Sequence, residues 1–517
     1  MVCTSQPLAV QAGLEMLRRG GNAIDAAVAA AAALTVVEPT SNGIGGDNFA
    51  LIWSGGKLHG LNASGRSPAA LKRSDYDAFD KVPRYGWWGV TVPGVVSGWV
   101  AAIERFGKLP LETVLAPAIE YAARGYMVSP EVAKYWGFAE RRYRDDAVFD
   151  AWRNTFLLNG RTPKTGELMP LPDHARTLEA IARTNGDAFY SGELASAMER
   201  AAIDAGAPLR QRDLEAHRAQ WVDPISMEYA GVRLHEIPPN GQGIAALSAL
   251  GMLKAIGANA SSPDDPELLH LQIEAMKLAF ADAHRYVADP ATMDVSTASL
   301  LDPGYLAQRA ATIDPSRAQD FDHGEPKPGG TVLLCTADAD GNMVSFIQSN
   351  YTGFGSGVVV PGTGIALQNR GACFTLERGH PNELAPSKLP YHTIIPAFVT
   401  RDVPTGGTMP VMAYGVMGGF MQPQGHLQVL TRIEAFDQNP QAALDAPRWQ
   451  VHTGKRVTIE PGHAPAVYEA LRARGHELEP QEQVNASFGR GQAIYRVGGH
   501  GYAGASDQRA DGHAGGF

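Results

Sequence analysis

The sequence has few of the residues that build disulfide frameworks or metal sites. Its three cysteines, Cys3, Cys335 and Cys373, are far apart among 517 residues. Their odd number and wide spacing exclude a disulfide framework and a CxxC metal pair. The 15 histidines show no HExxH spacing, so neither a metal nor an organic cofactor is implied. The glycine-rich stretch 43–46 lacks the GxGxxG spacing and a preceding strand, which argues against a dinucleotide site.

Long apolar runs and basic blocks are also scarce. The longest apolar run, residues 26–37, is alanine-rich, lies between Asp25 and Glu38, and is too short to cross a bilayer. No basic segment followed by an apolar one opens the chain, so we expect a cytoplasmic protein, or a periplasmic one if a leader was removed. The net charge is −10 and no basic block occurs. We therefore expect neither a nucleic-acid nor a membrane partner.

The composition is that of a globular, turn-rich protein, with 44% hydrophobic residues, 57 glycines and 35 prolines. The chain is too long for one simple core. Periodicity and capping residues predict helices at 8–19, 23–37, 110–124, 131–143, 178–184, 193–205, 244–256, 267–286, 424–434, 440–448 and 464–474. Strands are predicted at 49–53, 57–61, 227–237, 393–400 and 410–417. Helices segregated from strands, without βαβ alternation, predict a layered α+β architecture.

The segment 328–370 contains a predicted hairpin. Two apolar runs, residues 332–336 and 343–349, flank a turn cluster that contains Asp340-Gly341. Asp-Gly between two apolar runs is a strong hairpin signal. Because loop length sets register, a turn centred near Asp340 pairs residues whose numbers sum to about 680. This register places Ser349 opposite Thr331.

Two facing hydroxyls beside Gly329-Gly330 suit a threonine that becomes an N-terminus. A threonine hydroxyl is a weak nucleophile, and a free α-amine on the same residue, with a reference pKa of roughly 7.7–8.0, can take its proton. Gly330 would allow the strained backbone geometry that attack on its carbonyl requires. The alternative is an ordinary hairpin in which Thr331 and Ser349 form a cross-strand hydrogen bond.

Several blocks of the sequence resemble the γ-glutamyltranspeptidase family. Residues 13–29 and 37–46 are similar to the opening of that family, and residues 330–365 are similar to its cleavage region. Pro396, Met417-Gly418-Gly419 and residues 502–512 also fit. Blocks that match in the same order over nearly the whole chain are far more specific than a single motif.

The resemblance implies an N-terminal-nucleophile hydrolase with a four-layer αββα sandwich. One precursor would cut itself between Gly330 and Thr331 into a large subunit, residues 1–330, and a small subunit, residues 331–517, which stay together. A homodimer of such protomers is left open. Thr331 would attack an amide to form an acyl-enzyme that water or an acceptor amine resolves, and Ser349 matches the family's second hydroxyl. Gly418 and Gly419 match the oxyanion hole, where two adjacent N–H groups face a developing oxyanion; otherwise they are a tight turn.

Two residues that hold substrate in the family are replaced in this chain. The arginine for the substrate α-carboxylate aligns with Ser64, and Arg66, two residues later, is a candidate substitute. The acidic residue for the substrate α-amine aligns with Cys373. A neutral thiol cannot pair with an ammonium as a carboxylate does, and Cys373 is then expected to be a buried small hydrophobe.

Other positions gain new side chains. The family's asparagine after the second hydroxyl is Tyr351, and its paired serines are His392-Thr393. Arg370 stands where the family usually has an uncharged or acidic residue. This exchange predicts an acyl group that bears a carboxylate and no α-amine, as in oxamate-like or dicarboxylic half-amides. The alternatives are a structural ion pair for Arg370 and a packed, hydrogen-bonded ring for His392.

The sequence thus predicts a self-cleaving amidohydrolase or acyltransferase that acts on a small-molecule amide. γ-Glutamyl transfer or glutathione hydrolysis is the family default. A non-glutamyl amide such as oxamate, or a cephalosporin-type or glutaryl-type acylase substrate, is the competing prediction. A hypothesis of a different class is an uncleaved, inactive homologue that serves as a binding protein.

Overall fold

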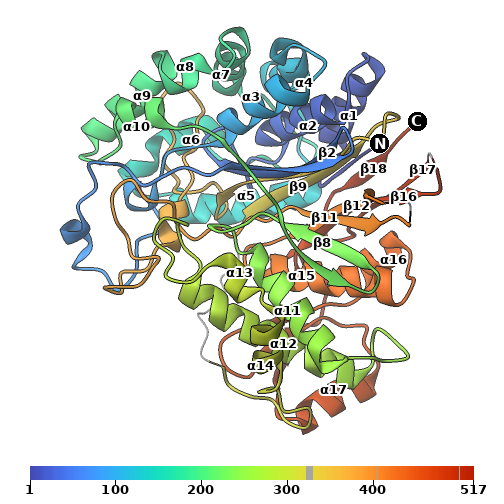
Figure 1. Ribbon diagram of the computed structural model, residues 1–517. Helices are drawn as coiled ribbons and strands as arrows, with labels where there is room; N and C mark the ends of the chain where they lie inside the picture. The colour runs from blue at the N-terminus through green and yellow to red at the C-terminus, as the bar shows by residue number, and fades with distance from the viewer. Residues whose placement is uncertain (322–329, 405, 500) are drawn as a thin grey trace.

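The computed structural model describes residues 1–321, 330–404, 406–499 and 501–517. Two β-sheets pack face to face, and helices cover the outer face of each sheet (Figure 1). The predicted four-layer αββα sandwich is therefore confirmed.

The first sheet has the strand order β18-β1-β9-β10-β2-β3-β6. Its strands are β1 (Val2–Thr4), β2 (Asp47–Ser54), β3 (Lys57–Ala63), β6 (Gln220–Val222), β9 (Gly330–Ala337), β10 (Met343–Tyr351) and β18 (His513–Gly515). The second sheet has the order β17-β16-β12-β11-β8-β7. Its strands are β7 (Ile225–Tyr229), β8 (Val232–Glu236), β11 (Ala397–Asp402), β12 (Thr408–Met417), β16 (Arg490–Val497) and β17 (Gly501–Ser506).

The helices fall into two layers. The layer on the first sheet comprises α1 (Pro7–Arg18), α2 (Ala23–Val37), α3 (Val95–Phe106), α4 (Leu111–Arg124), α5 (Pro130–Tyr143), α6 (Asp150–Phe156), α7 (Pro172–Arg183), α8 (Asp187–Tyr190), α9 (Glu193–Asp204) and α10 (Gln211–Ala216). The layer on the second sheet comprises α11 (Gly243–Ile256), α12 (Pro266–Tyr286), α13 (Thr297–Leu300), α14 (Pro303–Ala310), α15 (Met421–Leu430), α16 (Pro440–Asp445) and α17 (Pro465–Ala473).

The alternation of side chains along β9 explains why the layers form. Val332 and Leu334 pack into the core beneath the first helical layer. Leu333 and Cys335 point the other way, into the core between the sheets. Because successive residues of a strand face opposite sides, an uninterrupted apolar run needs cover on both faces. The odd-numbered residues of β9, Thr331 among them, therefore face the second sheet.

Helix α2 is buried over its whole length. Asn22 forms a capping box with Asp25, which satisfies backbone donors at the helix start. The sequence predicted this helix with the same bounds. Helix α3 was not predicted, since its Gly98 and valines weaken the helical signal. Gly98 is required there by packing, because a Cβ at this position would overlap with the Asn48 carboxamide.

The predicted strand at 393–400 was placed too early. Strand β11 begins at Ala397, after Pro396, which has no N–H to donate to a sheet. The preceding residues His392 and Thr393 instead make polar contacts that belong to the candidate site. The misplaced start of the strand therefore fell on Thr393, next to His392, two residues of the candidate site.

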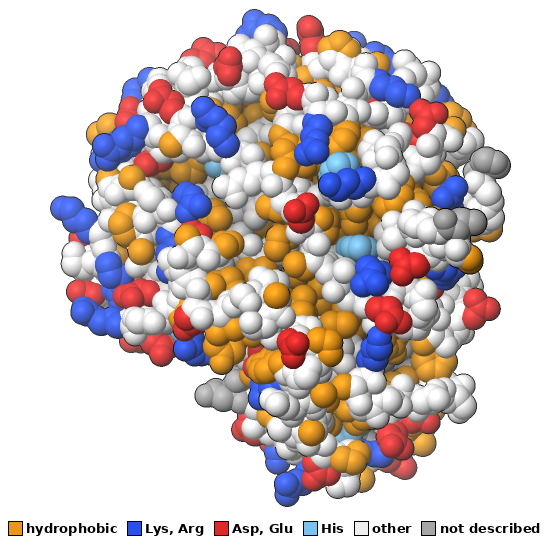
Figure 2. Space-filling view, viewed as in Figure 1, with side chains coloured by type: hydrophobic (Ala, Val, Ile, Leu, Met, Phe, Trp, Pro, Cys, Tyr) orange, Lys and Arg blue, Asp and Glu red, His pale blue; other side chains and the backbone are white. Residues whose placement is uncertain are grey.

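Residues 1–330 and residues 331–517 each contribute strands to both sheets, and they interleave in the first sheet. In the first sheet β9 and β10 lie between β1 and β2, and in the second β8 pairs with β11. Residues 1–330 and residues 331–517 therefore share the hydrogen bonds of both sheets and the hydrophobic cores. Acidic and basic side chains are interspersed over the face shown in Figure 2. No helix among the described residues is long and apolar enough to cross a membrane.

Candidate active site

The hairpin of β9 and β10 has the predicted register. Thr336 pairs with Val344 and Val332 pairs with Gln348, so both pairs sum to 680. Beyond Gln348 the register shifts, and Tyr351 pairs with Gly330. The irregularity lies at the open end of the hairpin and lets Ser349 contact both Gly330 and Thr331.

A chain of hydrogen bonds joins Thr331, Ser349 and Gly330. The Thr331 hydroxyl donates to the Ser349 hydroxyl, with 3.2 Å between the oxygens. The Ser349 hydroxyl donates in turn to the Gly330 carbonyl at 2.6 Å and accepts from the backbone N–H of Tyr351 at 2.8 Å. The prediction that the two hydroxyls face each other is confirmed. This arrangement polarises the carbonyl that precedes Thr331 and holds a hydroxyl beside it.

Gly330 is required by crowding. Its φ is not left-handed, so a left-handed resting conformation does not explain the glycine. A Cβ at this position would lie 2.8 Å from the backbone nitrogen of Gly353 and 3.3 Å from Cα of Ser41. Packing therefore keeps a side chain away from the Gly330–Thr331 junction.

Asp47 extends the site across a third strand. It is the cross-strand partner of Ser349 in the β2–β10 pair, and its neighbours Phe49 and Leu51 face the second sheet. Directly opposite residues on one sheet face have Cβ atoms about 4.5–5.5 Å apart. Thr331, Ser349 and Asp47 thus form a polar row on the inner face of the first sheet. Sequence reasoning missed Asp47; the available signal was an acidic residue at the start of a buried strand.

The Asp47 carboxylate is held by several donors. One oxygen accepts from the Gly94 N–H at 3.2 Å, and the other lies 3.2 Å from Nε2 of His392 and 4.0 Å from Nε of Arg370. Burial raises the pKa of Asp47 to about 7, against the opposing effects of the Arg370 charge and of backbone donors. Burial, followed by the Arg370 charge, lowers the pKa of His392 well below its usual value.

His392 is therefore neutral, and its surroundings select one tautomer. The Ile394 N–H donates to Nδ1 of His392 at 3.3 Å. The proton must then lie on Nε2, which donates to Asp47. His392 serves as a neutral donor that orients this carboxylate.

Arg370 is fully buried beside these groups. Its Nη1 donates to Oγ1 of Thr393 at 2.7 Å, and its guanidinium lies over the Tyr351 ring, 4.6 Å from the centroid. Its Nε and Nη2 have no hydrogen-bond partner among the described residues. Burial raises the pKa of the neighbouring Cys373 thiol, and the positive charge of Arg370 opposes this increase. The structure thus brings together four of the predicted substrate residues: Tyr351, Arg370, His392 and Thr393.

Arg66 does not join this group. Its Nη1 contacts the Asp289 carboxylate at 2.6 Å and the Ser387 carbonyl at 3.0 Å. It lines a cavity of about 160 Å³ together with Ser64 and His217, whereas the Thr331 and Arg370 side chains do not line that cavity. Arg66 is therefore paired with groups outside the candidate site. The Ser64 hydroxyl donates a hydrogen bond to the Asn62 side chain.

Gly418 and Gly419 follow the end of β12, with φ values of 133° and 60°. Such values favour glycine. Met417, the residue before them, pairs with Arg490, whose Nη2 donates to the Thr331 carbonyl at 3.3 Å. This contact places the glycine turn near the start of β9. Arg490, like Asp47, was not predicted from the sequence.

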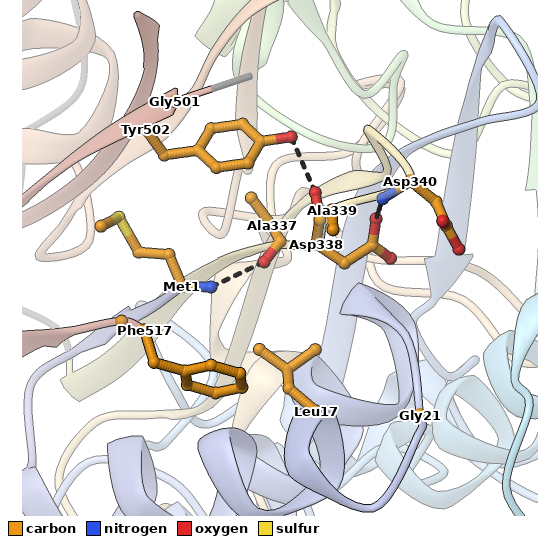
Figure 3. A pocket seen from close by; sticks show the side chains of 11 residues that line it. Met1, Leu17, Gly21, Ala337, Asp338, Ala339, Asp340, Gly501, Tyr502 and Phe517 are labelled. Carbon is orange, nitrogen blue, oxygen red and sulfur yellow. Dashed lines mark hydrogen bonds between the residues drawn. The ribbon is translucent and has the colours of Figure 1, made fainter.

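Two other features are separate from this site. His270, Glu274 and His476 are close enough to share a metal ion, but the buried Lys277 ammonium already donates to Glu274 at 2.7 Å. A cavity of about 540 Å³ lies at the turn end of the hairpin, where Tyr502 donates to the Asp338 carbonyl (Figure 3). Ala337 there is six residues from Thr331, or about 20 Å along a strand.

Comparison with known proteins shows the family to which this chain belongs. A family model described as gamma-glutamyltranspeptidase matches residues 9–517. The glutathione hydrolase-like YwrD proenzyme of Bacillus subtilis (strain 168) is 35% identical, over 99% of this chain and 98% of its own length. The oxamate amidohydrolase proenzyme of Klebsiella pneumoniae is 36% identical, over 100% of this chain and 98% of its own length. The crystal structure of a cephalosporin acylase from Bacillus halodurans is 50% identical with a TM-score of 0.94, over 99% of this chain and 94% of that one.

Proposed function

Because this chain belongs to the γ-glutamyltranspeptidase family and is an enzyme that hydrolyses amides or transfers their acyl groups, we propose that it cuts itself between Gly330 and Thr331 and then uses Thr331 as its nucleophile. The observation that carries this proposal is the hydrogen-bond chain from the Thr331 hydroxyl through Ser349 to the Gly330 carbonyl. The relatives named as proenzymes support it.

In the self-cleavage step the Thr331 oxygen attacks the Gly330 carbonyl carbon. The C–N bond breaks as an ester C–O bond forms, and the hydroxyl proton passes to the released amine. Water then hydrolyses the ester, which leaves a carboxylate on Gly330 and a free α-amine on Thr331. Ser349 stabilises the charge that develops on the carbonyl oxygen. The large subunit, residues 1–330, and the small subunit, residues 331–517, stay together because both contribute strands to each sheet: β9 and β10 lie between β1 and β2 in the first sheet, and β11 pairs with β8 in the second.

The mature enzyme repeats the chemistry on an external amide. The α-amine of Thr331 takes the proton of its own hydroxyl, and the oxygen attacks the substrate carbonyl. The amine of the substrate leaves with that proton. An acyl-enzyme remains until water or an acceptor amine resolves it. Backbone N–H groups of Gly418 and Gly419 face the oxyanion in this proposal, and Arg490 holds the backbone of Thr331 in place.

The acyl group that fits best carries a carboxylate and no α-amine. The observation behind this is Arg370, a buried guanidinium whose Nε and Nη2 have no hydrogen-bond partner among the described residues and whose Nε lies 4.0 Å from the Asp47 carboxylate. A planar guanidinium binds a carboxylate through two parallel hydrogen bonds. Cys373 stays a neutral thiol because its pKa is raised, so it offers no anion to an ammonium. Oxamate and short dicarboxylic half-amides have this chemistry.

A larger acyl group is the second candidate, and the 50% identical cephalosporin acylase favours it. A panel of oxamate, a glutaryl anilide, a γ-glutamyl anilide and glutathione separates the candidates. We expect kcat/KM to be at least tenfold higher for a substrate without an α-amine than for either γ-glutamyl compound, since an ammonium finds no counter-charge at Cys373. Faster turnover of the γ-glutamyl compounds overturns this specificity.

The nucleophile has its own test. Purified protein should give two bands, the smaller beginning Thr331-Val-Leu-Leu, and Thr331→Ala should remain a single chain of 55.1 kDa. A native protein that stays intact and inactive after long incubation supports the binding-protein hypothesis instead. Cleavage that persists in Thr331→Ala rules out the mechanism.

A further inference from the structure

Gln242 connects the two halves of the candidate site. It lies directly before α11 and is fully buried. Its side-chain Nε2 donates to the Thr393 carbonyl at 2.6 Å and to the Gly419 carbonyl at 2.9 Å. Both partners are backbone carbonyl oxygens, which only accept, so the carboxamide has only one orientation that satisfies both. One side chain therefore bridges the residue that holds Arg370 and the glycine turn after β12.

The remaining polar atoms of Gln242 are also engaged. Its Oε1 accepts from the Tyr391 hydroxyl at 3.1 Å, and its backbone N–H donates to the His392 carbonyl at 3.0 Å. Three consecutive residues, Tyr391, His392 and Thr393, are thus tied to Gln242. A buried and fully satisfied polar network fixes the relative positions of its members.

The glycine turn needs such a tether. Gly418 and Gly419 both have φ values that favour glycine, and a turn of two glycines resists displacement less than other residues do. On the other side, Thr393 Oγ1 accepts from Arg370. The continuous path runs from Arg370 through Thr393 and Gln242 to Gly419. It sets the spacing between the group that binds a carboxylate and the N–H groups that face an oxyanion.

We propose that Gln242 is a positioning residue that holds the Gly418–Gly419 turn at a fixed place relative to the Arg370–Thr393 pair. The inference rests on the proposed function, because it takes these two elements as the oxyanion hole and the carboxylate clamp. Gln242 touches neither Thr331 nor the Gly330 carbonyl in the described contacts. Self-cleavage uses Ser349 as its donor, so it does not depend on this bridge.

The test is Gln242→Met, a side chain of similar length that cannot donate to the two carbonyls. We expect self-cleavage within about twofold of the native rate and a kcat for the preferred amide that falls about 10- to 100-fold, since small misplacements of catalytic groups have effects of this size. KM should change less than kcat. This separation distinguishes positioning of the oxyanion turn from general loss of structure.

Gln428→Met is the matched control. Gln428 is also buried, donates to two carbonyls, of Gln424 and Trp449, and accepts one backbone N–H. Its loss should lower thermal stability comparably while kcat stays within about twofold to threefold. Equal losses of kcat in both variants, an unchanged kcat in Gln242→Met, or failure of Gln242→Met to cleave itself while folded would each overturn the proposal.

Tyr391→Phe decides the matter if Gln242→Met does not fold. It removes the donor to Oε1 and leaves both carbonyl contacts in place, so kcat should fall about threefold to fivefold with native self-cleavage. An unchanged kcat in Tyr391→Phe then contradicts the role of Gln242. A Thr331→Ala protein that still matures and turns over amide defeats the proposed function itself, which separates that failure from this one.

Discussion

The Ser349 hydroxyl accepts from the Thr331 hydroxyl at 3.2 Å and at the same time donates to the carbonyl of the residue before Thr331 at 2.6 Å. One side chain thus contacts the proposed nucleophile and the carbonyl of the peptide bond that we propose is cut. The Tyr351 N–H donates to the same Ser349 hydroxyl. This second donor helps to direct the hydroxyl proton of Ser349 towards the Gly330 carbonyl.

Replacing Ser349 by alanine should slow self-cleavage about 100-fold, because loss of one donor to a developing oxyanion has effects of that order. The rate is measured as the disappearance of the intact chain on a denaturing gel. Ser345→Ala is the control: Ser345 lies on the same face of β10 and donates to the Tyr414 carbonyl instead. Equal rates in the two variants would show that the hydroxyl of Ser349 has no special part in cleavage.

Gly330→Ala should slow self-cleavage about tenfold and lower the free energy of unfolding by about 1–3 kcal/mol. The added Cβ would lie 2.8 Å from the Gly353 nitrogen, so backbone must move, and both overpacking and misplacement follow. The readouts are the same gel assay and chemical denaturation. Gly137→Ala, where the new Cβ meets nothing within 4 Å, should leave the cleavage rate unchanged and, because Gly137 lies inside α5, raise the free energy of unfolding by about 0.5–1 kcal/mol. Normal cleavage in Gly330→Ala contradicts the crowding argument.

Arg370→Leu should reduce kcat/KM for a carboxylate-bearing amide at least 10- to 100-fold, since hydrogen bonds to a charged group contribute about 1.5–3 kcal/mol. Arg370→Lys keeps the charge and loses the planar fork, so about a tenfold loss is expected. An amide without a carboxylate should be affected much less. Arg285→Leu, at an exposed arginine paired with Asp294, is the control. Equal losses for both classes of substrate would mean that Arg370 is structural.

The buried Asp47 should make stability decrease with rising pH between about 4 and 7. Its pKa is about 7 in the folded protein and about 3.9 when unfolded. Between these values the folded state holds a proton that the unfolded state has released, so the free energy of unfolding falls as pH rises. Asp47→Asn should remove that part of the slope and gain relative stability towards pH 7.

Chemical denaturation at several pH values measures this slope. The measurement uses the Thr331→Ala background, which is expected to remain a single chain, so that two separate pieces do not complicate unfolding. The protein with Asp47 and the Asp47→Asn variant are compared from about pH 4 to 7. The same pH dependence of the free energy of unfolding in both would show that the pKa of Asp47 is not raised.

The hairpin was the most predictable part of the site. An Asp-Gly turn fixes which residues of two adjacent strands face each other, so the contact of Thr331 with Ser349 followed from counting. Asp47 was not predictable in this way. It is 302 residues away from Ser349 in the sequence, and the two residues meet only because β2 pairs with β10. Arg66 shows the converse: its nearness in sequence to Ser64 suggested a role, whereas the fold turns its guanidinium to Asp289.

The sequence by itself determined the layered α+β class, the all-buried helix α2, the register of the β9–β10 hairpin and the pair of hydroxyls at its open end. These features depend on local periodicity, capping and turn chemistry. Only the tertiary structure decided which side chains surround Arg370 and that Gln242 joins Thr393 to Gly419. Such contacts join residues from distant parts of the chain, because most buried polar groups in a folded protein must find hydrogen-bond partners.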